Sequence, residues 1–198
     1  NPVKACELLL NGRPSPIDVG RVLDLCFVSS VGVGFDATVA QEANRSIPVL
    51  RGPVVYTLAL IKVLFTYTAP AVRIRLDGRE ISSVVQLIAV TNAPTYGGGM
   101  KITPDAIMDD GKFEVCLIEK MGSLETLFHF PKVLVGRHLG LAQVKMYRAK
   151  EVEIEADRIV PMHMDGEVMQ AKRFHFEIAR RALPVIAATR TRFSRDAV

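Results

Sequence analysis

The sequence is poor in cysteine, and the cysteines that it has are unevenly placed. Cys6, Cys26 and Cys116 are odd in number, far apart and surrounded by aliphatic residues. Their spacing matches no metal site. We expect all three to be small hydrophobic residues of the core, kept reduced in a cytoplasmic protein.

A long uninterrupted apolar run is also absent. The longest apolar stretch, GPVVYTLALIKVLFTYTAP, contains Lys62 and falls short of the roughly 20 apolar residues that span a membrane. The first residues, NPVKACELLL, lack the basic region and cleavage site of a secretory signal, and Asn1 is not an initiator methionine. We therefore expect no transmembrane helix, and we expect the sequence to be part of a longer chain.

Aromatic residues make up only 7% of the sequence, and the net charge is a mild +4. The C-terminal stretch ARRALPVIAATRTRFSRDAV nevertheless contains five arginines. This stretch is either a solvated terminus or a contact to an anionic surface, and anionic membranes and nucleic acids both qualify. No aromatic residues interleave with the arginines as a base-stacking platform requires, so we do not expect nucleic-acid binding.

Short alternating segments predict a mainly β fold. The chain has 198 residues, of which 49% are hydrophobic, enough for one core or two small ones. Residues 73–81, RIRLDGREI, alternate around Asp77-Gly78, which indicates a tight hairpin. The other predicted strands are SSVVQLIAVTN, KFEVCLIEK, EVEIEA and RFHFEIA. Their number and spacing favour an antiparallel sandwich or barrel.

Fewer segments predict helices. Residues 1–12 have Pro2 at the start and Gly12 beyond the end of a helix. Residues 52–67 are apolar nearly all round, so this helix is buried or lies against an apolar ligand. Residues 123–140 begin at Ser123, an expected N-cap, and are interrupted by Pro131. Boundaries are expected in the turn-rich residues 12–20 and near residues 183–184.

Three stretches have the composition of functional sites, and the first is TNAPTYGGGMKITP. Gly97, Gly98 and Gly99 precede Lys101, which suggests a phosphate-binding loop, but Met100 interrupts the Gly-Lys-Ser/Thr order. The alternative is a mobile loop between strands, in which glycine allows the backbone to approach a neighbour closely.

The second stretch, PDAIMDDGKFEV, contains Asp105, Asp109 and Asp110. Carboxylate oxygens combined with carbonyls of a turn are ligands that Mg²⁺ or Ca²⁺ prefers. The spacing is not that of an EF-hand, and a plain acidic turn is the alternative.

The third stretch, MHMDGEVM, places Asp165 and Glu167 among apolar residues. Residues two apart on extended backbone point to the same side, which would bring both carboxylates to one site. Crowded, partly desolvated carboxylates call for a metal, a basic partner or a catalytic role. The alternative is a simple hairpin at Asp-Gly.

These stretches occur in the order and spacing of a known family. The matching segments are GVGFDATVAQEAN, RGPVVYTLALIKVL, NAPTYGGGMKITPDAIMDDGKFEVCLI, GRHLGLAQVKMYRAKEVEI, MDGEVM and FEIARRALPVI. Together they resemble the C-terminal domain of the bacterial diacylglycerol kinase-like lipid kinases, which are related to sphingosine and ceramide kinases and more distantly to NAD kinases. The resemblance covers nearly the whole chain.

The resemblance implies a mainly β, α+β fold: a two-sheet antiparallel β-sandwich with a few flanking helices. Members also have an N-terminal nucleotide-binding domain with a Gly-Gly-Asp-Gly-Thr motif, which this sequence lacks. In the family, a Gly-Thr-x-Asn-Asp-Phe-Ala segment runs into a helix start like NPVKA. Residues 1–12 are thus expected to lead from the missing domain, residues 13–183 to form the sandwich, and residues 184–198 to return to the missing domain.

The resemblance also assigns roles to residues. Glu167 would accept the proton of a lipid hydroxyl, and Asp165 would orient that hydroxyl or a bound metal. Asp110 would bind a structural Mg²⁺ together with the carbonyls of Ile107 and Lys112. ATP, the co-substrate, would be held mainly by the missing domain. Ala93 departs from the glycine that many members have there, which leaves the loop geometry open.

The implied protein is an ATP- and Mg²⁺-dependent lipid kinase of phospholipid metabolism, inactive without its nucleotide domain. It would phosphorylate a lipid hydroxyl, such as that of diacylglycerol, while bound peripherally to the inner face of the cytoplasmic membrane. Residues 53–67 would line the lipid site, and Phe128 and Phe130 would meet the bilayer. The choice of lipid and a homodimer stay open, as do two alternatives: a non-catalytic lipid-binding sandwich and an NAD kinase-like kinase of soluble substrates.

Overall fold

Strands dominate the fold. The computed structural model describes residues 1–46 and 53–187. In chain order the elements are α1 (Pro2–Asn11), β1 (Arg13–Val22), β2 (Leu25–Phe27), β3 (Ser30–Gly34), α2 (Phe35–Ser46), α3 (Pro53–Thr66), β4 (Ala71–Leu76), β5 (Arg79–Thr91), β6 (Phe113–Glu119), α4 (Ser123–Leu134), the 3₁₀ helix η1 (Arg137–Gly140), β7 (Val144–Ala149), β8 (Glu151–Met164) and β9 (Glu167–Ala187). The expected mainly β fold with a few helices is confirmed.

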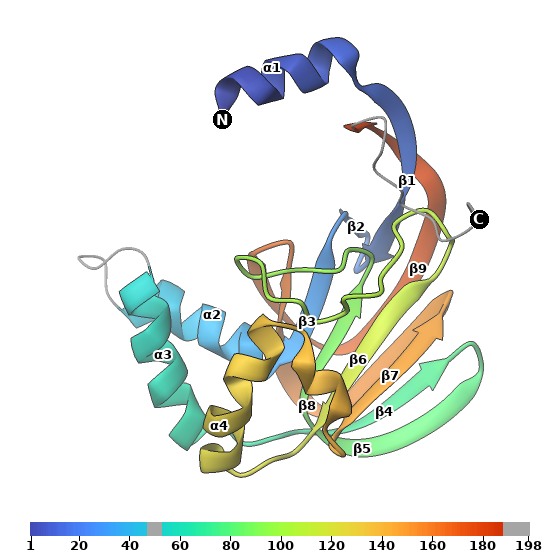
Figure 1. Cartoon of the computed structure of the whole chain (residues 1–198). Helices are drawn as coiled ribbons and strands as arrows, with labels where there is room; N and C mark the ends of the chain where they lie inside the picture. The colour runs from blue at the N-terminus through green and yellow to red at the C-terminus, as the bar shows by residue number, and fades with distance from the viewer. Residues whose placement is uncertain (47–52, 188–198) are drawn as a thin grey trace.

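The strands form one antiparallel hydrogen-bonded sheet of nine strands, eight of which follow the order β2-β1-β9-β8-β3-β5-β6-β7. Strand β4 pairs with both β5 and β8. Strand β3 pairs with the same two strands. The strands β8, β3, β5 and β4 therefore close into a ring, and the rest of the sheet curves away from it (Figure 1).

The main hydrophobic core lies within the curved sheet. The Phe27 and Phe113 rings stack at 5.7 Å between centroids, and Phe176 meets Phe27 edge-on at 6.3 Å. Gly20 lies opposite Phe27 on β1. A Cβ at residue 20 would lie 2.1 Å from the Phe27 ring, so the stack depends on glycine there. Burial of each such ring contributes about 1.5–3 kcal/mol.

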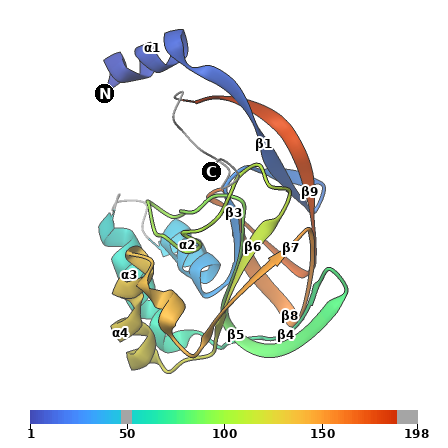
Figure 2. The same ribbon diagram turned by 45° about the vertical axis from the view of Figure 1, so that its right-hand side comes forward.

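Three helices cover one side of the molecule. Helices α2 and α3 share a second apolar cluster, in which Phe35 and Val39 of α2 meet Val63 of α3. In Figures 1 and 2, α2, α3 and α4 lie together, whereas α1 stands apart at the far end of β1 and β9. In the described ranges, 1–46 and 53–187, no helix combines the length and apolarity that crossing a bilayer requires.

Two local patterns folded as expected. Asp77 and Gly78, with φ of +46° and +87°, form the hairpin between β4 and β5. Helix α1 begins at Pro2, and the Asn1 side chain accepts a hydrogen bond from the Val3 amide at 3.0 Å.

The expected boundaries lie inside strands. Residues 13–20 form part of β1, although they contain Pro14 and Pro16. This part of β1 pairs with β9 and not with β2, which begins to pair only at Gly20. Proline is tolerated on such an edge because its missing N–H can face outward. Leu183 and Pro184 likewise lie within β9, which continues to Ala187.

Two finer expectations were wrong. The N-cap of α4 is Gly122, and the Ser123 hydroxyl instead donates a hydrogen bond to the Leu64 carbonyl at 2.7 Å. Only Cys116 is buried, and its burial raises the pKa of its thiol to about 12. Cys6 and Cys26 are exposed, because α1 buries no residue and because strand alternation directs Phe27, not Cys26, into the core.

Candidate functional site

A largely apolar cavity of about 1200 Å³ lies between helices α2, α3 and α4 and the sheet. Aliphatic and aromatic side chains form most of its wall, among them Val39 of α2, Leu60 of α3 and Phe130 of α4. The α3 helix thus contributes to the cavity, as the sequence suggested. Polar side chains gather where the loop at residues 96–100 and the turn at residues 165–166 border the cavity.

Asp36, Tyr96 and His163 form a hydrogen-bonded cluster in the cavity wall. His163 Nε2 lies 2.8 Å from Asp36 Oδ2, and the Tyr96 hydroxyl donates to the same oxygen at 3.1 Å. The Tyr96 and His163 rings stack at 5.3 Å with an interplanar angle of 14°. Because an ionised Asp36 only accepts hydrogen bonds, His163 is the donor at Nε2.

The electrostatics of this cluster favour an ion pair. Burial lowers the pKa of His163, but the charge of Asp36, the hydrogen bond to it and the charge of Asp165 raise that pKa above its usual value. Burial and the neighbouring Asp36 raise the pKa of Tyr96 well above its usual range, so the phenol keeps its proton.

The Asp-Gly-Glu segment is the turn between β8 and β9. Asp165 and Gly166 have φ of +46° and +102°, and Met164 pairs with Glu167. This is a two-residue hairpin. The expectation that Asp165 and Glu167 point to one side of extended backbone was therefore wrong, because the chain reverses between them. Both residues are exposed rather than enclosed by the neighbouring methionines.

The carboxylate of Asp165 fixes this turn in place. Its oxygens accept hydrogen bonds from the backbone amides of Val28, Ser29 and Ser30, at 2.7, 3.0 and 2.9 Å. The Asp165 amide donates to the Ser30 carbonyl at 3.0 Å. The hairpin is thus tied to the start of β3. Asp165 and Gly166 line the cavity, and Glu167, the next residue, is exposed.

The glycine-rich loop borders the same cavity. Gly97, Gly98 and Gly99 all have positive φ, and Tyr96 and Met100 pair across them. The loop connects β5 to β6, so the helix that follows a phosphate-binding loop of the Walker type is not there. Ala93 does not have a positive φ, so alanine fits the backbone at this position.

The acidic turn lies at the other end of this connection. Asp110 Oδ1 accepts from the Lys112 amide at 3.1 Å, and Asp110 Oδ2 forms an ion pair with Arg148. Arg148 also contacts Glu114 at 2.7 Å. Arg148 therefore supplies positive charge where the sequence suggested a metal.

Asp109, beside it, has a buried carboxylate oxygen without a hydrogen-bond partner among the described residues. Burial raises the pKa of Asp109; Arg181 lowers it, and the charges of Asp18 and Asp110 raise it further. An unpartnered oxygen next to Asp110, in a turn that offers carbonyls, fits a site for a hard cation such as Mg²⁺.

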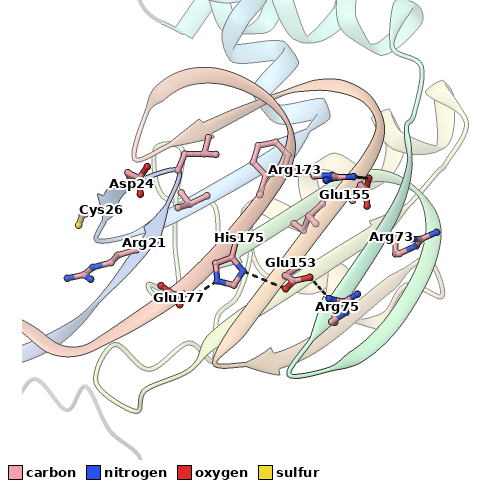
Figure 3. A pocket seen from close by; sticks show the side chains of 14 residues that line it. Arg21, Asp24, Cys26, Arg73, Arg75, Glu153, Glu155, Arg173, His175 and Glu177 are labelled. Carbon is pink, nitrogen blue, oxygen red and sulfur yellow. Dashed lines mark hydrogen bonds and ion pairs between the residues drawn. The ribbon is translucent and has the colours of Figure 1, made fainter.

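A second hollow, of about 810 Å³, lies on the strands β1, β2, β4, β8 and β9 (Figure 3). Its charged side chains pair with one another: Arg75 with Glu153 at 2.6 Å, and Arg173 with Glu155 at 2.8 Å. His175 points between Glu153 and Glu177 (Figure 3). This hollow is exposed and charged, whereas the other cavity is largely apolar and is lined by residues 165 and 166 of the hairpin, so we place the candidate site in the apolar cavity.

Sequence reasoning missed the polar cluster. Asp36 lies in GVGFDATVAQEAN, one of the segments that carry the resemblance, and His163 lies in MHMDGEVM, but neither residue was given a role. The signal was Asp36, two residues after the glycine that ends an apolar strand. Only the topology shows that this residue meets His163, which lies 127 positions further along the chain.

Comparison with known proteins supports the lipid-kinase resemblance. Residues 29–187 match the model of the YegS C-terminal NAD kinase beta sandwich-like domain. A diacylglycerol kinase of Mycobacterium tuberculosis is 31% identical over 84% of this chain and 55% of its own length. A probable lipid kinase YegS-like protein of Shewanella frigidimarina is 25% identical over 91% of this chain and 58% of its own length.

A solved structure has the same fold. The crystal structure of a diacylglycerol kinase from Bacillus anthracis matches with a TM-score of 0.68 and 17% identity, over 96% of this chain and 60% of that chain. At this identity the likeness concerns the fold alone. The chain spans about half the length of the curated relatives it matches.

Proposed function

The chain belongs to the family of YegS C-terminal NAD kinase beta sandwich-like domains, and we propose that it is the lipid-binding and catalytic domain of an ATP- and Mg²⁺-dependent lipid kinase. The observation that best supports this proposal is the position of the apolar cavity. It lies beside the hairpin that contains Asp165 and Glu167. An acyl chain fits such a cavity, and the hydroxyl to be phosphorylated would lie next to the two carboxylates.

In the proposed mechanism the oxygen of the lipid hydroxyl bonds to the γ-phosphorus of ATP while the bond from that phosphorus to the bridging oxygen of the β-phosphate breaks and ADP leaves. Glu167 accepts the proton of the hydroxyl. Phosphoryl transfer depends on positioning and charge neutralisation more than on strong base chemistry, so an exposed carboxylate suffices. Asp165 holds the hairpin through the amides of residues 28–30. We propose that Glu167, which follows the cavity-lining Gly166, reaches the bound hydroxyl from there. The nucleotide would come from an N-terminal domain outside this chain.

We propose that the acidic turn holds a structural Mg²⁺, with Asp110 as side-chain ligand and the carbonyls of Ile107 and Lys112. When bound, the ion supplies positive charge that stabilises the turn. The buried, unpartnered oxygen of Asp109 and the position of Asp110 support this assignment. The ion would compete with Arg148 for Asp110.

The protein would act at the inner face of the cytoplasmic membrane. Phe128 of α4 is 72% exposed, and Phe130 lines the cavity, so α4 links the surface to the proposed lipid site. Of the arginine-rich end, Arg180 and Arg181 belong to β9, and residues 188–198 lie outside the described ones. The partners would be the lipid and the N-terminal domain, without nucleic acid.

The test uses the intact protein that contains these residues, supplied with Mg·ATP carrying a labelled γ-phosphate and with a total lipid extract. Glu167→Gln removes the proton acceptor and keeps the shape, so we expect lipid labelling to fall about 10²- to 10⁴-fold. The matched control is Glu177→Gln, on the same strand and 65% exposed at its side chain. Its labelling should equal that of the wild type.

Two outcomes would overturn the proposal. Lipid labelling that survives Glu167→Gln would leave the hairpin without a catalytic role and support a non-catalytic lipid-binding domain. Competition by water-soluble nucleosides, with no lipid labelled, would instead support an NAD kinase-like enzyme. Unchanged folding of the variant is checked by its circular dichroism spectrum.

A further inference from the structure

Three residues from distant parts of the chain converge on one oxygen in the cavity wall. Asp36 comes from the first turn of α2, Tyr96 from the β5–β6 connection and His163 from β8. Both His163 Nε2 and the Tyr96 hydroxyl contact Asp36 Oδ2. The other oxygen, Oδ1, accepts from the Ala37 amide at 2.8 Å. The catalytic step proposed above uses none of the three.

Gly32 leaves space for this cluster. Gly32 of β3 is the register partner of His163 on β8. A Cβ at residue 32 would lie 2.0 Å from Asp36 Oδ2 and 2.4 Å from His163 Nε2. The Asp36 side chain thus reaches back across β3 over a bare backbone. Any other residue at position 32 would push the two groups apart.

The cluster is a hydrogen-bonded polar group in a largely apolar cavity, which Gln86, His129 and His138 also line. The side chains of Asp36 and His163 are 15% and 10% exposed, and Tyr96 is 9% exposed as a residue. All three line the cavity, together with Asp165. In apolar pockets a few convergent polar groups fix the orientation of the ligand and decide its specificity.

The charges beside the cluster disfavour an anionic head. In the described part of the chain, no lysine or arginine lines the cavity, whereas Asp36 and Asp165 both do. His163 is paired with Asp36, so it adds no free positive charge. A phosphate head would meet two carboxylates without a guanidinium or ammonium partner, which is unfavourable in a partly desolvated site. In contrast, the hydroxyl or ester of an uncharged lipid head would meet hydrogen-bond donors and acceptors in this cluster.

Building on the proposed function, we propose that Asp36, Tyr96 and His163 bind the uncharged, hydroxyl-bearing head of the lipid and select against lipids with a phosphate head. The Tyr96 oxygen donates its hydrogen to Asp36 and keeps its acceptor lone pairs for a substrate hydroxyl. His163 lies two residues before Asp165, so the cluster and the catalytic hairpin are held on the same strand end. The acyl chains occupy the apolar remainder of the cavity.

Steady-state kinetics of the intact protein test this inference, with diacylglycerol and phosphatidylglycerol as substrates in mixed micelles. Tyr96→Phe removes one hydroxyl and keeps the ring stacked on His163. We expect it to raise KM for diacylglycerol about 3- to 10-fold and to leave kcat nearly unchanged. The matched control is Tyr67→Phe, because the Tyr67 hydroxyl bonds the Gln86 carbonyl and does not line the cavity.

Asp36→Asn tests lipid selectivity, a property that would not change if Asp36 only stabilised the fold. Removing the negative charge should lower the preference for diacylglycerol over phosphatidylglycerol about tenfold, measured as the ratio of the two kcat/KM values. Thermal denaturation checks that both variants fold. Wild-type preference for phosphatidylglycerol, or variants whose KM and preference equal those of the wild type, would overturn the inference. If the wild type phosphorylates no lipid, the proposed function itself fails.

Discussion

The Asp18 side chain is completely buried, and its two carboxylate oxygens bind two segments far apart in the sequence. Oδ2 accepts from the Gly111 amide at 2.6 Å, and Oδ1 accepts from the Arg181 amide at 2.7 Å. The Asp18 carbonyl also accepts from the Asn92 side chain at 2.8 Å. Asp18 thus joins β1 to the acidic turn and to β9 at Arg181, where φ is +50°.

Asp18→Ala should destabilise the protein by about 2–5 kcal/mol, because two buried backbone amides lose their acceptors and each loss costs about 1–3 kcal/mol. Urea denaturation followed by circular dichroism measures the change. Asp157→Ala is the control, because Asp157 forms an exposed ion pair with Arg158; such pairs contribute about 1 kcal/mol or less. Equal stability of the two variants would show that Asp18 does not join these segments.

The sequence predicted a functional role for some residues of the site and not for others. It selected Asp165, because Asp-Gly-Glu is a local pattern, and it selected Asp110 for the same reason. It gave no role to Asp18 or Asp36, whose partners lie 163 and 127 positions away. The spacing rule also failed at Asp165, since a hairpin reverses the chain where extended backbone was assumed. Local motifs are legible in a sequence, whereas contacts made by strand pairing are not.

Helix α4 presents an apolar stripe to solvent. Leu124 and Phe128, one helical turn apart, are 75% and 72% exposed. Lys132, a further turn along, lies over the Phe128 ring at 5.7 Å. Apolar side chains beside a cation suit the interface of an anionic membrane. The neighbouring Phe130 lines the cavity, so a lipid could pass from a bilayer at α4 to the proposed site.

Replacing Leu124 and Phe128 together by serine should weaken binding to vesicles of phosphatidylcholine and phosphatidylglycerol at least tenfold, because each buried apolar side chain is worth about 1.5–3 kcal/mol. Vesicle co-sedimentation of the intact protein measures this. Ile159→Ser serves as control, because Ile159 is 66% exposed on β8 and lies outside the cavity wall. If all three proteins sediment alike, α4 does not contact the membrane.

Helices and strands whose own residues favour them were predicted from the sequence. Those that depend on packing or pairing with distant segments were not. The hairpin at Asp77-Gly78 and the apolar α3 follow from turn chemistry and composition. Strand β1 was missed because Pro14 and Pro16 suggest a turn, and only its edge position opposite β9 permits them. Helix α2 was missed as well. It begins directly after Gly34, where φ is +109° and no loop separates strand from helix.

On the scale of the whole molecule, the described residues have what an independently stable fold needs, but not what phosphoryl transfer needs. The ring of β8, β3, β5 and β4 encloses a core of buried side chains. In contrast, the cavity wall described here has no lysine or arginine to hold a triphosphate, and the sequence has no Gly-Gly-Asp-Gly-Thr segment. Folding and lipid binding should therefore separate from catalysis.

We expect residues 1–198 alone to unfold in one cooperative transition and to bind diacylglycerol, but to transfer no phosphate to it from Mg·ATP. The core and the cavity both lie within the described residues, whereas the proposed function assigns the positioning of the γ-phosphate to a domain outside this chain. Labelled-phosphate transfer is measured beside the intact protein at equal lipid concentration, and urea denaturation monitors folding. Detectable ATP-dependent labelling of lipid by these residues alone would show that they hold the nucleotide themselves. Non-cooperative unfolding would instead show that the sheet depends on the N-terminal domain for its stability.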